Sequence, residues 1–153
     1  MEAETVAYLV NNVDNIVAIK EASGDFSNIV KMMNLTDGKL DLYSGNDDQI
    51  VPLMSLGAKG VISVLSNVAP KEAHDIVALY NEGKVKESCD LQLKALPLIH
   101  ALFSEVNPIP VKKALNLMGK EVGPLRGPLS EMEEGHAAKL AEEMKKFGIT
   151  LAE

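Results

Sequence analysis

A lysine at the end of a short apolar run is the residue best suited to chemistry in this chain. Residues 15–20 form a β-branched run that predicts a buried strand, and Lys20 is its last residue. Side chains alternate between the two faces of a strand, so the small Ala18 shares a face with Lys20 and leaves room beneath it. Sheets and barrels place their ligands at the carboxyl ends of parallel strands. The position therefore predicts a reactive amine.

Burial decides whether such an amine reacts. A lysine side chain has a pKa near ~10.4, so it is protonated and not nucleophilic at neutral pH. Desolvation disfavours the ammonium, and lowering the pKa to near neutrality takes roughly 4 kcal/mol, which burial can supply. The neutral amine then attacks a ketone and forms a Schiff base, which acts as an electron sink. The simpler alternative, favoured by spacing alone, is that Lys20 extends its ammonium into water.

Three repeats of strand, turn and helix surround this lysine, after a first helix over residues 3–11. The repeats predict strands over 15–20, 40–44 and 61–65, and helices over 26–35, 49–56 and from Pro70 to Gly83. Alternation of short β-type runs with helical patterns is typical of a parallel α/β sheet.

Only helical patterns follow residue 83. A long helix over 85–103 contains Pro97, which is expected to kink or divide it. Residues 107–110 are expected to be extended, because each residue before a proline avoids the α region, and a short helix over 111–118 follows. Ser130 to Glu133 predicts a capping box for the last helix, and Gly148 predicts its end.

Composition excludes several classes of protein. The chain has 153 residues, 15 Lys and Arg against 22 Asp and Glu, and a net charge of −7, which argues against nucleic acid as a partner. No apolar run approaches the ~20 residues of a membrane helix, and the acidic N-terminus predicts no signal peptide. The lone Cys89 excludes an intrachain disulfide and favours a cytoplasmic location.

Other polar residues have simpler structural interpretations. The three histidines are far apart without metal-ligand spacing, and Cys89 is expected to be a packing residue. Asp47 and Asp48 are expected to cap a helix rather than hold a cation. No metal site is predicted.

Four segments, in order, resemble one family. The runs Ile16–Asp25 (IVAIKEASGD), Tyr43–Asp48 (YSGNDD), Gly57–Pro70 (GAKGVISVLSNVAP) and Asn107–Lys112 (NPIPVK) are similar to segments of the dihydrodipicolinate synthase group of class I pyruvate aldolases. Sialic acid lyases of the same superfamily are similar in the lysine strand. The last two segments favour the synthase.

The resemblance implies a function for three positions. Lys20 would be the amine that condenses with pyruvate, Ile62 would hold the bound pyruvate through its backbone, and Gly45 would lie near the same pocket. The implied reaction joins pyruvate to aspartate semialdehyde on the route to diaminopimelate and lysine. No metal or organic cofactor is implied, because the lysine itself is the electron sink.

The same resemblance implies an α/β fold that is a partial TIM barrel. Residues 1–83 would be half-barrel βα units holding the last three parallel strands, and residues 84–153 a C-terminal helical extension, together one structural unit. A full barrel takes about 250 residues. The family's catalytic tyrosine, threonine relay, substrate arginine and lysine-inhibitor site would belong to the other half, and Tyr43, on a different strand, does not replace that tyrosine.

Two hypotheses remain from the sequence. In the first, the chain is a Schiff-base lyase that is incomplete alone; exposed sheet edges predict a homo-oligomer or a complementing N-terminal half. In the second, it is an inactive truncated aldolase that serves as an oligomeric scaffold or binding module, or a related lyase of the sialic acid lyase superfamily. The surroundings of Lys20 distinguish them.

Overall fold

The computed structural model describes residues 1–152, which form two compact units. The first unit is Met1–Ser63, and the second begins at Val64 and contains the remaining described residues. The structure thus divides the chain between Ser63 and Val64 rather than after residue 83. Helix α4 (Pro70–Asn81) packs along helix α5 (Val85–Leu102) within the second unit.

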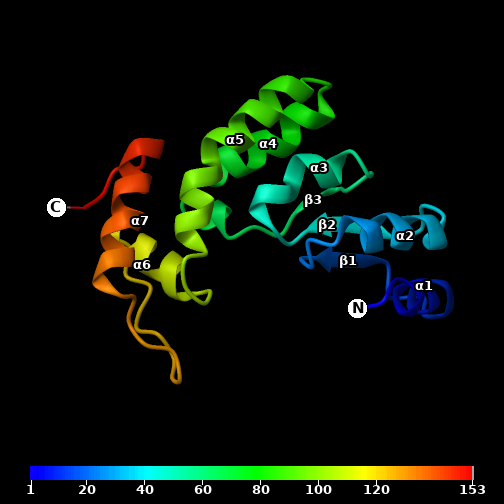
Figure 1. The fold of residues 1–153 in the computed structure, drawn as a ribbon, viewed down its shortest axis with the longest axis horizontal. Coiled ribbons are helices and arrows are strands. Elements are labelled where there is room, and N and C mark those ends of the chain that lie inside the picture. Colours follow the sequence, from blue (N-terminus) through cyan, green and yellow to red (C-terminus); the bar gives the residue numbers. More distant parts are fainter. Residues whose placement is uncertain (153) are drawn as a thin grey trace. The chain divides into compact units, whose positions relative to one another are not determined.

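The first unit is built on a three-stranded parallel sheet in the order β1–β2–β3 (Figure 1). Its elements are α1 (Ala3–Asn12), β1 (Ala18–Glu21), α2 (Phe26–Thr36), β2 (Asp41–Ser44), the 3-10 turn η1 (Asp47–Gln49), α3 (Ile50–Met54) and β3 (Gly60–Val61). The α/β class and the parallel sheet that the alternating pattern predicts are confirmed.

Helices α1 and α2 pack together and bury a small apolar core. Val6, Met32 and Leu40 are buried in it, and Ile19 of β1 packs against them. Helix α2 begins where predicted because the Asp25 side chain accepts a hydrogen bond from the peptide nitrogen of Asn28 at 3.0 Å. This cap sets the first residue of α2.

The two later strand–helix repeats are shorter than predicted. Strand β3 is only Gly60–Val61, because it pairs with β2 on one side alone and the chain then enters the 3-10 turn η2 (Leu65–Asn67) of the second unit. The helix expected over 49–56 is η1 followed by α3, and Gly57 with φ 88° ends it in a left-handed turn.

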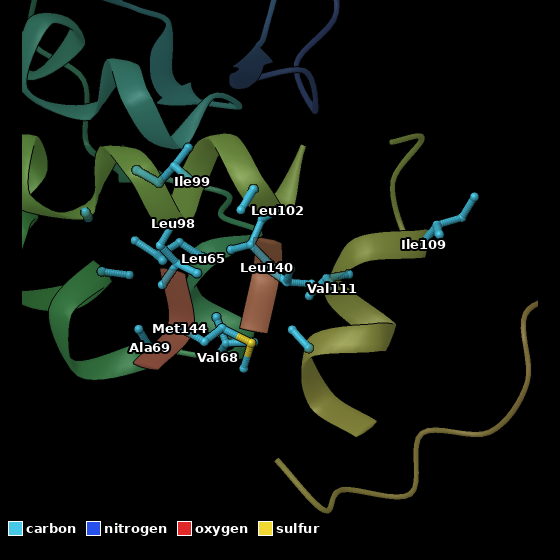
Figure 2. Packing of buried hydrophobic residues seen from close by; sticks show 14 of the residues in the cluster. Leu65, Val68, Ala69, Leu98, Ile99, Leu102, Ile109, Val111, Leu140 and Met144 are labelled. Carbon is cyan, nitrogen blue, oxygen red and sulfur yellow. The ribbon is translucent and has the colours of Figure 1, made fainter. Parts of the chain in front are cut away.

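The second unit is helical and has the larger core. After η2 and α4 come α5, α6 (Ile109–Leu117) and α7 (Glu134–Phe147). Figure 2 shows side chains from these helices gathered around the fully buried Leu65, with Leu98, Leu140 and Met144 among them. Close packing of such residues holds this unit together. In the described residues no helix combines the length and apolar character needed to cross a bilayer.

Three sequence expectations in this unit are corrected. Helix α5 continues through Pro97 without dividing. Proline has no N–H, so the carbonyl of Leu93 has no helical partner. Both residues are exposed, so solvent can donate a hydrogen bond to that carbonyl. Helix α6 starts at Ile109, so the segment before residue 111 is not extended throughout. Pro110 lies in the first turn of α6, where its missing N–H costs little.

The third correction concerns the start of α7. The capping box at Ser130 does not form, and the helix begins four residues later at Glu134. The cap comes instead from Glu105, whose Oε1 accepts from the peptide nitrogen of Glu133 at 3.0 Å and lies 2.8 Å from Nδ1 of His136. Potential ligand atoms of Glu105, Glu133 and His136 lie within 4.8 Å of one another. The hydrogen bonds of Glu105 explain this cluster of three residues as a helix cap.

Candidate active site

The three residues that the sequence analysis selected lie at the carboxyl end of the same sheet. Lys20 is the third residue of β1, Gly45 follows the last residue of β2, and Ile62 follows the last residue of β3. All three belong to the first unit, so one rigid sheet brings them together. The parallel topology therefore brings residues that are far apart in the sequence to the same edge of the sheet.

Backbone hydrogen bonds hold these strand ends in register. The peptide nitrogen of Gly45 donates to the carbonyl oxygen of Glu21 at 2.7 Å, and that of Ile62 donates to the carbonyl oxygen of Ser44 at 2.8 Å. The N–H of Ile62 is therefore used within the sheet. The ladder therefore extends one residue beyond β2 and β3.

Gly45 is required by space rather than by backbone conformation. A β-carbon at this position would lie 2.7 Å from Cβ of Ala22, 3.0 Å from Cε of Lys20 and 3.1 Å from the carbonyl oxygen of Glu21. Contacts this short are repulsive. The missing side chain is thus what lets the alkyl chain of Lys20 pass over the end of β2.

The sheet has one covered face and one exposed face. Leu42 and Ser44 are fully buried on the face against which the helices of this unit pack, whereas Ala18 and Lys20 are exposed on the other. The expectation of a buried strand is wrong for the face that carries Ala18 and Lys20. In residues 1–63 the helices supply cover for one face only, so the desolvated setting predicted for Lys20 is not provided.

Two neighbours of Lys20, Tyr43 and Glu21, lie on opposite faces of the sheet. Tyr43 is paired in register with Lys20, and neighbouring residues of parallel strands face the same way, so Tyr43 lies on the face of the lysine. Glu21 lies on the opposite face and is 5% exposed. The sequence signal that could have identified Glu21 is a carboxylate in a strand whose other residues on that face are apolar.

The turn after β2 differs from its prediction. Asp47 and Asp48 begin the 3-10 turn η1, whose N-cap is Asn46 with no side-chain cap. The turn is shaped by Ser44, whose hydroxyl donates to the carbonyl oxygen of Asn46 at 2.7 Å. Asp47 and Asp48 are thus the first two residues of η1, and their role as helix caps stays a prediction.

Comparison with known proteins identifies the family. Residues 1–147 match the profile of the dihydrodipicolinate synthetase family, and the chain belongs to that family. A relative from Lachnoclostridium phytofermentans, a 4-hydroxy-tetrahydrodipicolinate synthase, is 66% identical over 145 residues, which are 95% of this chain and 49% of the relative. One from Clostridium tetani with the same name is 49% identical over 146 residues, 95% of this chain and 50% of its own length.

Solved structures agree with this assignment. The dihydrodipicolinate synthase of Thermotoga maritima is similar with a TM-score of 0.92 and 41% identity, over 97% of this chain and 51% of that one. The chloride-inhibited enzyme of Acinetobacter baumannii, solved with pyruvate, has a TM-score of 0.90 and 37% identity, over 97% of this chain and 51% of that one. The chain spans about half the length of the curated relatives it matches.

Proposed function

We propose that this chain carries the Schiff-base lysine of a lyase of the dihydrodipicolinate synthase type. Lys20 condenses with pyruvate, and aspartate semialdehyde is the second substrate. The observation that carries the proposal is the approach of the Lys20 side chain to Gly45, where a β-carbon would lie 3.0 Å from Cε. Membership of the dihydrodipicolinate synthetase family supports the assignment of the substrate.

The chemistry needs the amine alone to form a covalent bond. The neutral amine of Lys20 attacks C2 of pyruvate, and the oxygen leaves as water with one proton from the amine and one from the solvent. The resulting iminium withdraws electrons from the neighbouring methyl carbon. The carbonyl of Ile62 would accept a hydrogen bond from the hydroxyl of the first adduct. Loss of a methyl proton then gives the carbon nucleophile.

The exposed face of the sheet indicates what the reaction still needs. Ala18 and Lys20 are exposed, and water around an ammonium favours its charged form. We infer that further strands cover this face in the active assembly. They come from a complementing half of the family's fold or from other copies of the chain, and they supply the proton-transfer group, worth roughly 10²–10⁴ in rate.

Reductive trapping tests the role of Lys20. The chain is incubated with pyruvate and borohydride, and peptide mass mapping locates the reduced adduct. We expect the adduct on Lys20 and none after Lys20→Ala, whereas Lys59→Ala, which removes another exposed lysine of the same unit, keeps it. An adduct spread evenly over the lysines, or none on Lys20, contradicts the proposal.

A complementation experiment tests the need for further strands. The amino-terminal half of the relative from Lachnoclostridium phytofermentans is purified and added to the chain. Trapping at Lys20 is expected to accelerate, and consumption of aspartate semialdehyde is expected only in the mixture. Full turnover by the chain alone contradicts this part of the proposal.

A further inference from the structure

Glu21 is a buried acid for which the proposed chemistry has no use. It follows Lys20 directly, ends β1 and is 5% exposed. Burying a carboxylate is costly unless hydrogen bonds replace its water. Its side chain points to the covered face of the sheet, away from Lys20, so it does not touch a substrate bound by the lysine.

The two oxygens that Glu21 uses connect different parts of the site. Its side-chain Oε1 accepts from the peptide nitrogen of Ser23 at 2.5 Å, which closes the turn after β1. Its main-chain oxygen accepts from the peptide nitrogen of Gly45 at 2.7 Å, which fastens the end of β2.

These bonds fix the path that the lysine side chain follows. Ala22 lies between Glu21 and Ser23, and its Cβ is 2.7 Å from the position of a β-carbon on Gly45. Cε of Lys20 is 3.0 Å from the same position. Because Ala22 and Lys20 both crowd this one point, a shift of the turn by a fraction of an ångström changes where the amine lies.

We propose that Glu21 is a positioning residue whose buried carboxylate holds the turn after β1 and thereby aims Lys20 at the pyruvate carbonyl. The inference rests on the proposed function of Lys20. Loss of alignment at a reacting atom lowers rates steeply, and a displacement of about 1 Å can cost about 10²-fold.

The test measures the rate of borohydride trapping at Lys20 as a function of pyruvate concentration. Glu21→Ala is expected to lower the rate at saturating pyruvate about tenfold or more. Glu21→Gln keeps an oxygen that accepts from Ser23, and it is expected to restore most of the rate. The matched control is Asp25→Ala, which removes the cap of α2 but keeps the bond from the peptide nitrogen of Ser23 to the Glu21 carboxylate, and it should trap at the wild-type rate.

Each result has a separate meaning. Wild-type trapping together with an unchanged rate in Glu21→Ala overturns this inference and leaves the proposed function intact. Equal loss in Glu21→Ala and Asp25→Ala, with parallel loss of thermal stability, overturns it as well, since any damage to the turn would then suffice. Absence of trapping in the wild-type chain overturns the proposed function and this inference with it.

A further variant covers the case in which Glu21→Ala does not fold. Glu21→Asp keeps the charge but is shorter by one methylene, so its carboxylate reaches Ser23 poorly. A reduced rate in Glu21→Asp with wild-type thermal stability supports positioning. A wild-type rate in this variant overturns it.

Discussion

Cε of Lys20 lies 3.0 Å from the point that a β-carbon of Gly45 would occupy. The glycine is therefore part of the lysine's environment, although it has no functional group of its own. The family resemblance predicts that Gly45 lies near a substrate pocket, and its contacts give a steric reason for a residue without a side chain at that point.

Replacement of Gly45 by alanine should displace Lys20. The added methyl overlaps Ala22 and Lys20, so we expect Gly45→Ala to reduce trapping of pyruvate at Lys20 by about tenfold or more. Gly135→Ala in α7 is the control, because nothing lies within 4 Å of its β-carbon position. Normal trapping in a folded Gly45→Ala protein would show that the contact has no functional effect.

Glu105 should stabilise the second unit through the start of α7. Glu105→Ala removes the acceptor for the peptide nitrogen of Glu133 and the partner of His136, and loss of a helix cap costs about 1 kcal/mol. Urea denaturation should report this loss. Glu131→Ala, an exposed residue just before α7, should leave the midpoint unchanged; an equal loss there would contradict the capping role.

Acid should weaken the second unit through Glu143. Hydrogen bonds from the ammonium groups of Lys139 and Lys146 hold the pKa of Glu143 below its ordinary value of 4.5. A group with a lowered folded-state pKa contributes stability above its unfolded pKa and loses it as pH falls through the folded pKa. The urea midpoint should therefore fall on acidification below about pH 4.5, in the range where the group takes up its proton.

The matching variant tests the origin of that fall. Glu143→Gln cannot ionise, so its urea midpoint should be lower at pH 7 and should change less on acidification. Lys146 and Lys139 also lower the pKa of the neighbouring Glu142, so Glu142 should account for part of the remaining fall in the urea midpoint on acidification. An unchanged pH profile in Glu143→Gln would assign the acid sensitivity to other carboxylates.

The core around Leu65 predicts a large effect of truncation in α7. Leu140 is fully buried, so Leu140→Ala should lower the free energy of unfolding by about 2–5 kcal/mol through lost burial and the cavity left behind. Leu93→Ala provides the control, because Leu93 is 58% exposed. Similar denaturation midpoints for the two variants would contradict the packing described for this unit.

The sequence predicted the elements that have strong local signals and missed those set by tertiary contacts. The apolar alternation around Lys20 gave β1, and Asp25 gave the start of α2, because both signals are local. The start of α7 was misplaced because its cap comes from Glu105, about 30 residues earlier, which no local pattern reveals.

The candidate site shows the same division. Lys20, Gly45 and Ile62 were selected through a family resemblance, and the parallel register explains why they lie at one end of the sheet. Lys20 is exposed, which agrees with the alternative that spacing alone favours and not with the desolvated setting that a reactive amine needs. Whether a strand face is covered depends on which other segments pack on it, and the residues of the strand do not carry that information.

In the first unit, the face of the sheet that packs against the helices is opposite the face that carries the reactive lysine. Ile19 and Leu42 contribute to cohesion on one side, and Lys20 projects from the other, so exchanging the lysine removes little packing. We therefore expect position 20 to accept other side chains. We expect substitution of Lys20 to leave the thermal midpoint of the unit nearly unchanged, so that a loss of reactivity can be assigned to the missing amine and not to unfolding.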